Sequence, residues 1–265
     1  MRSHAPLVIG SYNVHQCVGV DGLRSPDRIA AVVSQLGASV IGLQEIDARA
    51  GDGVGFDQLR QIARSSDFEF VRGPTLFRDD GHYGNGLLTR LPIRSVRRID
   101  LSLPGREPRG ALDVELAHDG ARIRIVATHL GLSPEERRIQ CDRLIDRVRP
   151  SDDFDLSVLL GDFNEWWAPG RLLRRLHRCF GRTRSVRTFP SRAPVLALDR
   201  IWVRPGPALV EFRAHRSAMA RVASDHLPVR AVVALPGVEH RASTRAMSNL
   251  RRDDADLPRG AAAGA

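Results

Sequence analysis

One short stretch constrains the fold of this chain more than any other. Val158, Leu159 and Leu160 form an apolar run, which is typical of a strand buried on both faces. The run ends at a glycine, and Asp162 and Asn164 follow. Because side chains alternate along a strand, we expect these two polar groups on one side, where their oxygens suit a hard cation. An Asx turn after the strand explains the same residues equally well.

Polar side chains follow apolar strand patterns at several other places in the chain. They are Asn13, Glu45, His129, Asp199 and the neighbouring pair Asp225 and His226. Each of these residues alone is weak evidence for a functional site, because histidines and carboxylates also serve structural roles. Several carboxylates gathered at one edge of a sheet repel one another unless a cation compensates. The set therefore favours metal-dependent chemistry.

Strand and helix patterns alternate along the chain and predict an α/β protein. Ser25-Pro26 and Ser133-Pro134 each have the pattern of a helix N-cap followed by proline at the first helical position. His118-Asp119-Gly120 joins two alternating runs, as expected for a β-hairpin. Periodicity is lost near the C-terminus. We therefore expect one domain over residues 1–237 and a disordered Arg- and Ala-rich tail over residues 238–265.

Charge and cysteine content narrow the functional class. The formal net charge is +9, and all 40 basic residues are arginine. A GC-rich genome explains the absence of lysine most simply, but the positive balance still attracts polyanions such as nucleic acid or anionic lipid headgroups. The three cysteines lie far apart without C-x-x-C spacing, so no disulfide framework is indicated. Without a membrane-spanning run or a signal peptide, we expect a cytoplasmic monomer.

Taken together, these motifs resemble the endonuclease/exonuclease/phosphatase superfamily, which includes DNase I, exonuclease III-type AP endonucleases, neutral sphingomyelinases and inositol polyphosphate 5-phosphatases. The resemblance covers residues 7 to 235. The matching stretches are Ser11-Tyr12-Asn13-Val14, Leu43-Gln44-Glu45, Gly84-Asn85-Gly86-Leu87-Leu88, Thr128-His129-Leu130, Gly161-Asp162-Phe163-Asn164 and Ser224-Asp225-His226-Leu227-Pro228-Val229. The family implies a four-layer α/β sandwich, with two mixed β-sheets packed face to face, helices outside and the active site at one edge.

The resemblance implies a Mg²⁺ site that Mn²⁺ can also fill. Glu45 resembles the main ligand of the family, and Asn13, Asp162 and Asp225 resemble direct or water-mediated ligands. Such a set of hard oxygen donors suits Mg²⁺ and argues against zinc.

The resemblance also assigns catalytic roles. His226 resembles the histidine that acts as general base or binds the scissile phosphate, and Asp199 resembles its carboxylate partner. Asp162 is the alternative base, and Asn164 orients the nucleophile or binds the phosphate. His129 resembles the second histidine of the DNase I and sphingomyelinase branches, which acts on the leaving oxygen.

Asn85 and Arg109 complete the implied set as substrate-binding residues. Arg109 lies in a Pro-Arg-Gly segment like that of some bacterial members, where it would clamp a phosphate. An exposed loop arginine is an equally good interpretation. Trp166 and Trp167 follow Asn164, and core packing is slightly favoured over a place on the wall of the cleft.

The expected function is Mg²⁺-dependent phosphodiester hydrolysis by in-line attack of water on nucleic acid or a phospholipid-like substrate. A phosphomonoesterase on a phosphorylated small molecule or lipid, and a non-catalytic phosphate-binding module, are the alternatives. His129 stands where AP endonucleases carry a tyrosine, which counts against abasic-site repair. The substrate motifs of the 5-phosphatases are not found, so that branch is disfavoured.

Overall fold

The computed structural model describes residues 6–49, 56–149, 151, 153–167 and 170–235. The tail expected over residues 238–265 lies outside the described residues. Within them, no helix is long and apolar enough to cross a membrane.

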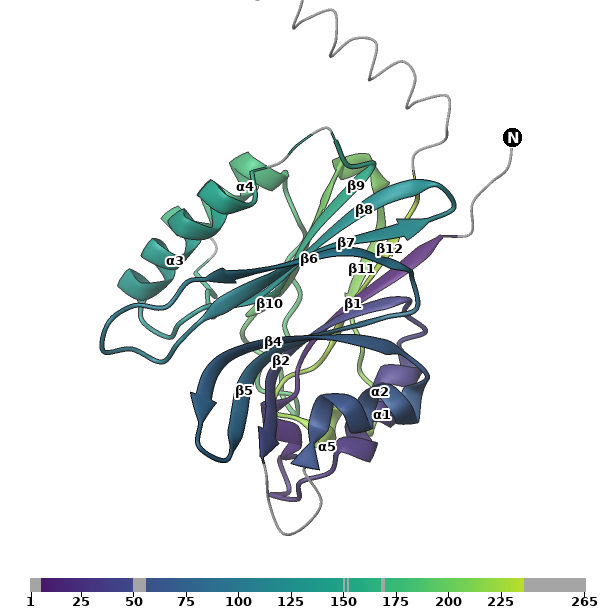
Figure 1. The fold of residues 1–265 in the computed structure, drawn as a ribbon, viewed down its shortest axis with the longest axis vertical. Helices are drawn as coiled ribbons and strands as arrows, with labels where there is room; N and C mark the ends of the chain where they lie inside the picture. Colours follow the sequence, from purple (N-terminus) through teal and green to yellow (C-terminus); the bar gives the residue numbers. More distant parts are fainter. Residues whose placement is uncertain (1–5, 50–55, 150, 152, 168–169, 236–265) are drawn as a thin grey trace, which may run out of the picture.

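Two mixed β-sheets pack face to face (Figure 1). In spatial order, the first sheet contains β11 (Leu209–Ala214), β12 (Val229–Val233), β1 (Leu7–Asn13), β2 (Val40–Arg49), β5 (Gly81–Thr89) and β4 (Glu69–Arg78), with β3 (Phe56–Asp57) paired to β2. The second sheet contains β10 (Asp199–Arg204), β9 (Leu156–Asp162), β8 (Ala121–His129), β7 (Gly110–His118) and β6 (Ile93–Asp100). The pairs β1–β2 and β8–β9 are parallel, and the other pairs are antiparallel.

Helices cover the outer face of each sheet. The elements outside the sheets are η1 (His15–Cys17), α1 (Pro26–Gln35), α2 (Gln58–Ser66), α3 (Pro134–Arg147), α4 (Arg171–Phe180), η2 (Gly206–Ala208) and α5 (Ala220–Ala223). Apolar residues of α1 and α2 pack on the first sheet, and those of α3 and α4 pack on the second. A third apolar cluster fills the space between the sheets. These four layers confirm the predicted α/β sandwich.

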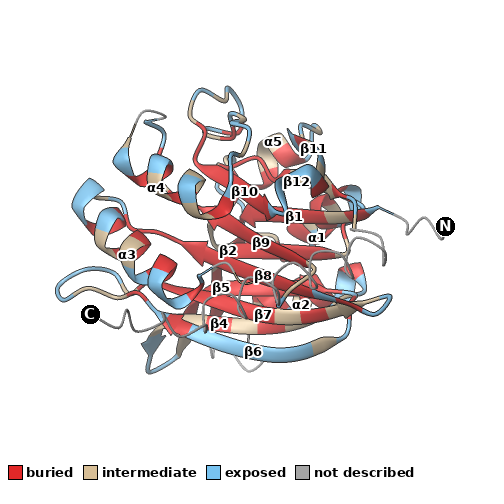
Figure 2. Ribbon diagram, turned by 90° about the horizontal axis from the view of Figure 1, so that it is seen from above, coloured by how far each residue is buried: buried red, intermediate tan, exposed pale blue. Residues whose placement is uncertain are grey.

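Burial follows these layers. The central strands are buried, whereas the outward faces of α3 and α4 and most of the edge strand β6 are exposed (Figure 2).

Two predicted local features are confirmed. The side chains of Ser25 and Ser133 each accept a hydrogen bond from the backbone of their helix, from Arg28 and Glu136 respectively, at 3.2 Å. The hairpin between β7 and β8 turns at residues 119 and 120, both with positive φ.

Candidate active site

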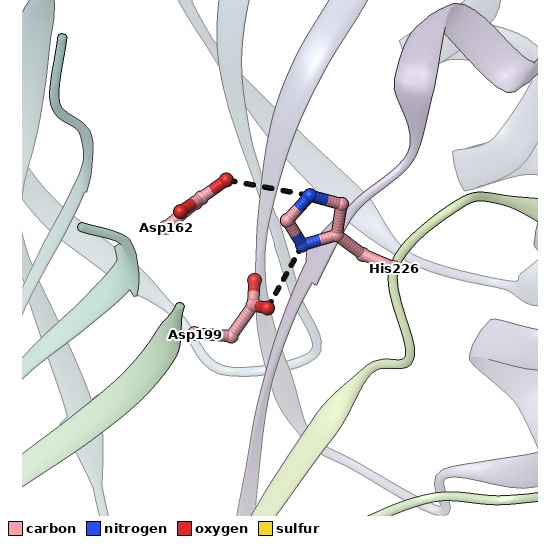
Figure 3. A group of neighbouring side chains, drawn as sticks. All are labelled: Asp162, Asp199 and His226. Atoms are coloured by element: carbon pink, nitrogen blue, oxygen red, sulfur yellow. Dashed lines mark hydrogen bonds and ion pairs between the residues drawn. The ribbon is translucent and has the colours of Figure 1, made fainter. Parts of the chain in front are cut away.

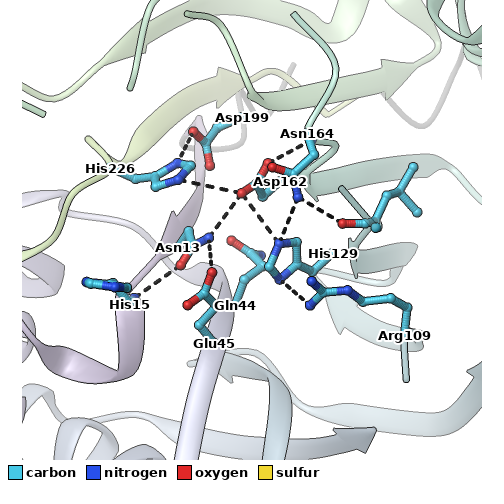
Figure 4. Close-up of polar contacts among 12 residues, drawn as sticks. Asn13, His15, Gln44, Glu45, Arg109, His129, Asp162, Asn164, Asp199 and His226 are labelled. Carbon is cyan, nitrogen blue, oxygen red and sulfur yellow. Dashed lines mark hydrogen bonds and ion pairs between the residues drawn. The ribbon is translucent and has the colours of Figure 1, made fainter. Parts of the chain in front are cut away.

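The register of three strands lines up three of the predicted residues in the second sheet. Asp162 at the end of β9 pairs with His129 at the end of β8, and on its other side with Asp199 at the start of β10. The first sheet contributes Asn13 from the end of β1 and Glu45 from β2. The structure therefore brings these five side chains to one edge of the sandwich, as predicted from the sequence (Figure 4).

The turn after β9 is built on Gly161. Its φ is +145°, and a Cβ at this position would lie 1.9 Å from the carbonyl oxygen of Thr128, so a larger residue is excluded. Oδ1 of Asp162 accepts a hydrogen bond from the backbone nitrogen of Asn164 at 2.8 Å. This contact confirms the alternative interpretation of an Asx turn after the strand. Asn164 lies beyond the strand with a φ of 51°. The alternation argument for its position was therefore wrong, because the turn and not a strand places it.

The carboxylate of Glu45 reaches the site through an irregularity in β2. The pairing of β2 with β5 shifts register between Leu43 and Ile46, and Glu45 has a φ of 60°. Such bulges redirect a side chain and are frequent beside active sites. Nδ2 of Asn13 donates to Oε1 of Glu45 at 2.9 Å and to Oδ2 of Asp162 at 3.0 Å. One amide thus joins carboxylates from both sheets.

Three nitrogen atoms converge on Oδ2 of Asp162. Nδ2 of Asn13 lies at 3.0 Å, Nε2 of His129 at 3.6 Å and Nε2 of His226 at 3.7 Å. Asp162, Asn13, His129 and His226 are all buried. A polar centre of this kind, enclosed between two sheets, can bind an anion through its N–H groups and a cation through its carboxylates.

His226 is held by a carboxylate and by its own turn (Figure 3). Its Nδ1 lies 2.9 Å from Oδ2 of Asp199, and the same oxygen accepts a hydrogen bond from Oγ1 of Thr188 at 2.5 Å. Ser224 accepts from the backbone nitrogen of His226 and donates to the carbonyl of Asn13, which ties the turn to β1. Thr188 was not predicted, because nothing in the sequence around it marks a contact with Asp199.

The two histidines have pKa values shifted in opposite directions. Burial lowers the pKa of His226, but the negative charges of Asp199 and Asp162 outweigh it and raise the pKa to about 10. Burial, and then the positive charge of Arg109, lower the pKa of His129 to about 3. In the protein alone, His226 therefore carries a proton on each ring nitrogen, whereas His129 is neutral.

Arg109 is buried, so its interpretation as an exposed loop residue is wrong. Only 6% of it is exposed, and its Nη1 lies 3.1 Å from Nδ1 of His129 and 3.1 Å from Oε1 of Glu107. A guanidinium group has donors only, so Nδ1 of His129 is the acceptor. Nε2 of the same ring faces both Asp162 and the side-chain amide of Asn164.

The remaining predicted residues lie around this centre. Nδ2 of Asn164 donates to the carbonyl of Leu130 at 2.9 Å and lies 3.1 Å from Nε2 of His129. Nδ2 of Asn85 donates to the carbonyl of Gly110 at 3.0 Å, which joins β5 to β7 beside Arg109.

Asp225 lies on the more exposed side of the site. Its Oδ1 is 3.3 Å from Oγ of Ser224 and 3.9 Å from Nδ1 of His15. Its side chain is 32% exposed. His15 was not predicted, although it follows directly from the strand that carries Asn13.

The donor set fits a hard divalent cation. Glu45 and Asp162 place carboxylate oxygens against one amide, and Oδ1 of Asp199 is buried without a hydrogen-bond partner among the described residues. Asp162, Asp199 and His226 also offer ligand atoms within 4.8 Å of one another. The short contact between Asp199 and His226 suits that pair to orienting the ring, which leaves Glu45 and Asp162 as the stronger candidates for metal ligands.

Trp166 and Trp167 are exposed, so the expectation of core packing was wrong. Their exposed fractions are 53% and 57%, and their rings form an edge-to-face pair with centroids 5.7 Å apart. The backbone after Asn164 turns outward here, and the core positions nearby are filled instead by Phe163 and Trp202, whose rings are in edge-to-face contact.

Comparison with known proteins identifies relatives over most of the chain. The model of the endonuclease/exonuclease/phosphatase family matches residues 10–226. The uncharacterized protein YbhP of Escherichia coli (strain K12) is 32% identical over 179 residues, which cover 63% of this chain and 69% of that protein.

Solved structures share the fold. An endonuclease/exonuclease/phosphatase from Beutenbergia cavernae superposes with a TM-score of 0.69 at 23% identity, covering 88% of this chain and 72% of that one. Mannosyl-6-phosphatase from Bacteroides thetaiotaomicron gives 0.65 at 16% identity, covering 86% and 99%. Truncated TDP2 from Caenorhabditis elegans gives 0.59 at 16% identity, covering 86% and 97%. At these identities, the likeness shows the fold alone.

The family match includes every predicted site residue from Asn13 to His226. The chain therefore belongs to the endonuclease/exonuclease/phosphatase family, whose members are hydrolases of phosphate esters and generally depend on a divalent metal.

Proposed function

We propose that this protein is a Mg²⁺-dependent phosphodiesterase that hydrolyses a phosphate diester by in-line attack of water. One observation carries the proposal. Nitrogen atoms of Asn13, His129 and His226, from both sheets, converge on one oxygen of Asp162. Carboxylates that hold a cation and N–H groups that hold a phosphate are then within reach of one another.

The metal-binding residues in this proposal are Glu45 and Asp162, assisted by Asn13 and by Asp225 from the exposed side. A Mg²⁺ ion held by these residues would neutralise charge on the phosphate. Mn²⁺ is the expected substitute because it prefers the same hard oxygen donors.

The chain's own residues position the phosphate, the water and the leaving oxygen. As water attacks, it gives a proton to Asp162, a new P–O bond forms opposite the ester oxygen, and the bond to that oxygen breaks. Asp199 fixes the ring of His226, so that its Nε2 faces the reacting phosphate, and Asn164 lies beside the same position. His129 would assist the departure of the leaving oxygen through Nε2, while Arg109 holds the opposite side of that ring.

The substrate in this proposal is a diester from nucleic acid or a phospholipid-like molecule. The phosphomonoesterase and the non-catalytic module remain the outcomes against which the proposal is tested.

The test compares purified protein on bis(p-nitrophenyl) phosphate, p-nitrophenyl phosphate, plasmid DNA and a phospholipid panel, each with Mg²⁺, Mn²⁺ or EDTA. We expect metal-dependent release from the diester in preference to the monoester, and the preferred natural substrate identifies the branch. Preference for the monoester would replace the proposal with a phosphomonoesterase. Folded protein that binds Mg²⁺ and turns over none of these substrates would favour the binding module.

A further inference from the structure

An arginine-rich surface follows α4 along the outside of the second sheet. Three adjoining hollows of about 640, 390 and 580 Å³ share residues of this helix. We name it the α4 arginine surface and define it by Arg171, Arg174, Arg175, Arg178, Arg182 and Arg204, which line these hollows. The helix presents Arg171, Arg174, Arg175 and Arg178 away from the sheet because its leucines pack on the sheet. Arg182 follows the helix, and Arg204 ends β10.

The positive charge of this surface is only partly compensated. Asp142 and Asp146 are the acidic side chains that line the hollows, and Nη1 of Arg175 pairs with Oδ1 of Asp142 at 2.6 Å. A concave surface on which two exposed guanidinium groups, those of Arg178 and Arg182, have no ion pair among the described residues suits a chain of phosphates.

Along the chain, the exposed tryptophan pair lies between the site residue Asn164 and the start of α4. Trp166 follows Asn164 by two residues, and α4 begins at Arg171. At the far end, Arg204 closes β10, the strand that begins at the catalytic-site residue Asp199. Six strand residues span roughly 17 Å, so the surface leads from the edge of the site to the opposite end of the sheet.

Buried charged residues fix the loop that carries the tryptophans. Oε1 of Glu165 accepts from the backbone nitrogen of Trp167 at 3.0 Å, and its Oε2 accepts from Arg137 at 3.3 Å. Arg137 also donates to the carbonyl of Leu132, so the loop is tied to the one that follows β8. Glu165 and Arg137 are 8% and 5% exposed. These contacts anchor the loop while both tryptophan rings stay in solvent. A loop held in this way is suited to stacking a planar group on its rings.

We propose that the α4 arginine surface and the Trp166–Trp167 pair bind a single strand of nucleic acid. Its phosphates lie along the arginines, and its unpaired bases stack on the tryptophans beside the catalytic site. A membrane fits less well, because the surface along α3 and α4 is hollowed and lined by charged side chains, and its exposed large apolar side chains among the described residues, Leu132, Trp166 and Trp167, lie at one end. The inference deepens the proposed function by naming the substrate class, and that step rests on the proposed function.

The test measures binding of fluorescein-labelled dT20 by anisotropy in EDTA, so that no turnover intervenes. Arg178→Glu/Arg182→Glu should weaken binding at least tenfold and lower the slope of log Kd against log salt by about 1.4, or about 0.7 for each phosphate that the variant no longer binds. Trp166→Ala/Trp167→Ala should weaken it about tenfold. The matched control is Arg64→Glu/Arg94→Glu, which makes the same charge change at exposed positions on α2 and β6 and should stay within twofold of wild type.

The outcomes separate this inference from the proposed function. The inference of a nucleic-acid surface is overturned if the protein does not bind dT20, or if the α4 variant binds dT20 as tightly as the control does. It is also overturned if the α4 arginines are needed for binding to anionic phosphatidylglycerol vesicles in place of dT20. The α4 variant should still hydrolyse bis(p-nitrophenyl) phosphate at the wild-type rate, since its changes lie outside the site. α4-dependent dT20 binding by protein without turnover would support the surface, but would overturn the proposed function and the substrate assignment.

Discussion

Nδ1 of His226 lies 2.9 Å from Oδ2 of Asp199, the oxygen that also accepts the hydroxyl hydrogen of Thr188. These residues come from the turn before β12, the first position of β10 and the segment before β10. The contact leaves one orientation for the ring, with Nε2 toward Asp162. Much of the proposed chemistry depends on this arrangement.

Asp199→Asn should lower kcat on bis(p-nitrophenyl) phosphate by about 10²–10⁴-fold, because the amide no longer stabilises and orients the ring as a carboxylate does. Thr188→Val removes a neighbouring hydrogen bond and leaves the Asp199–His226 contact, so its effect should be about fivefold. Both are measured under saturating metal, with thermal unfolding as the control for folding. Equal effects of the two changes would contradict the assignment of Asp199 as the main partner of His226.

Arg109 should act on His129 as well as on the substrate. Arg109→Met removes the donor at Nδ1 of the ring, and we expect kcat to fall about 10–100-fold, the equivalent of one hydrogen bond from a charged donor. Arg106→Met changes an exposed arginine of the same loop and should leave kcat unchanged. A rise in KM with unchanged kcat in Arg109→Met would show instead that this arginine only binds the substrate.

An ion pair in the second sheet should be important for stability but not for activity. Arg124 makes two hydrogen bonds to Asp113, at 2.8 and 2.7 Å, and both residues are 8% exposed. Arg124→Ala leaves the carboxylate short of a buried partner and should lower the free energy of unfolding by about 3 kcal/mol in urea.

The matched control for this pair is Arg97→Ala. Arg97 donates to the same carboxylate, but its side chain is 55% exposed, so its loss should cost less than about 1 kcal/mol. Asp113→Leu added to Arg124→Ala should recover part of the lost stability, since no buried charge then remains. Equal costs for the two single changes would contradict the difference in burial.

His177 should make stability depend on pH. Its Nδ1 accepts the indole hydrogen of Trp202 at 3.0 Å, and burial lowers its pKa, helped by the charges of Arg200 and Arg182. The unfolded chain therefore binds more protons than the folded one below about pH 6.5, so this contribution to stability is present above that pH and is lost as the pH falls through it. His177→Gln should remove the contribution, which urea unfolding of both proteins at pH 7.5 and 5.5 measures. A variant with an unchanged pH dependence would contradict this role.

The sequence predicted the residues of the site better than the reasons for their positions. Asn13, His129 and Asp162 end apolar strands as predicted, because strand register is a property of the backbone and of the apolar pattern. The same prediction was wrong for Asp199, which begins β10, and for Glu45, which lies inside β2. The turn that places Asn164 and the bulge that places Glu45 depend on positive φ at residues other than glycine, which a residue pattern does not reveal.

The sequence also did not reveal which side chains distant parts of the chain bury. Arg109 is buried beside His129, a residue of β8, and the core near Trp166 is filled by Phe163 together with Trp202, a residue of the later strand β10. Strand β4 was not predicted, since Arg72, Gly73 and Pro74 interrupt its apolar pattern, and its pairing with β5 supplies the missing signal.

The central claim is that the residues around Asp162 form a metal-dependent catalytic site. The most direct measurement is the rate of bis(p-nitrophenyl) phosphate hydrolysis with Mg²⁺, with EDTA, and by the Asp162→Ala and His226→Ala proteins with Mg²⁺. We expect EDTA to abolish turnover and each substitution to lower it at least 10²-fold in protein that remains folded. Turnover that persists in EDTA, or that both substitutions leave unchanged, would contradict it.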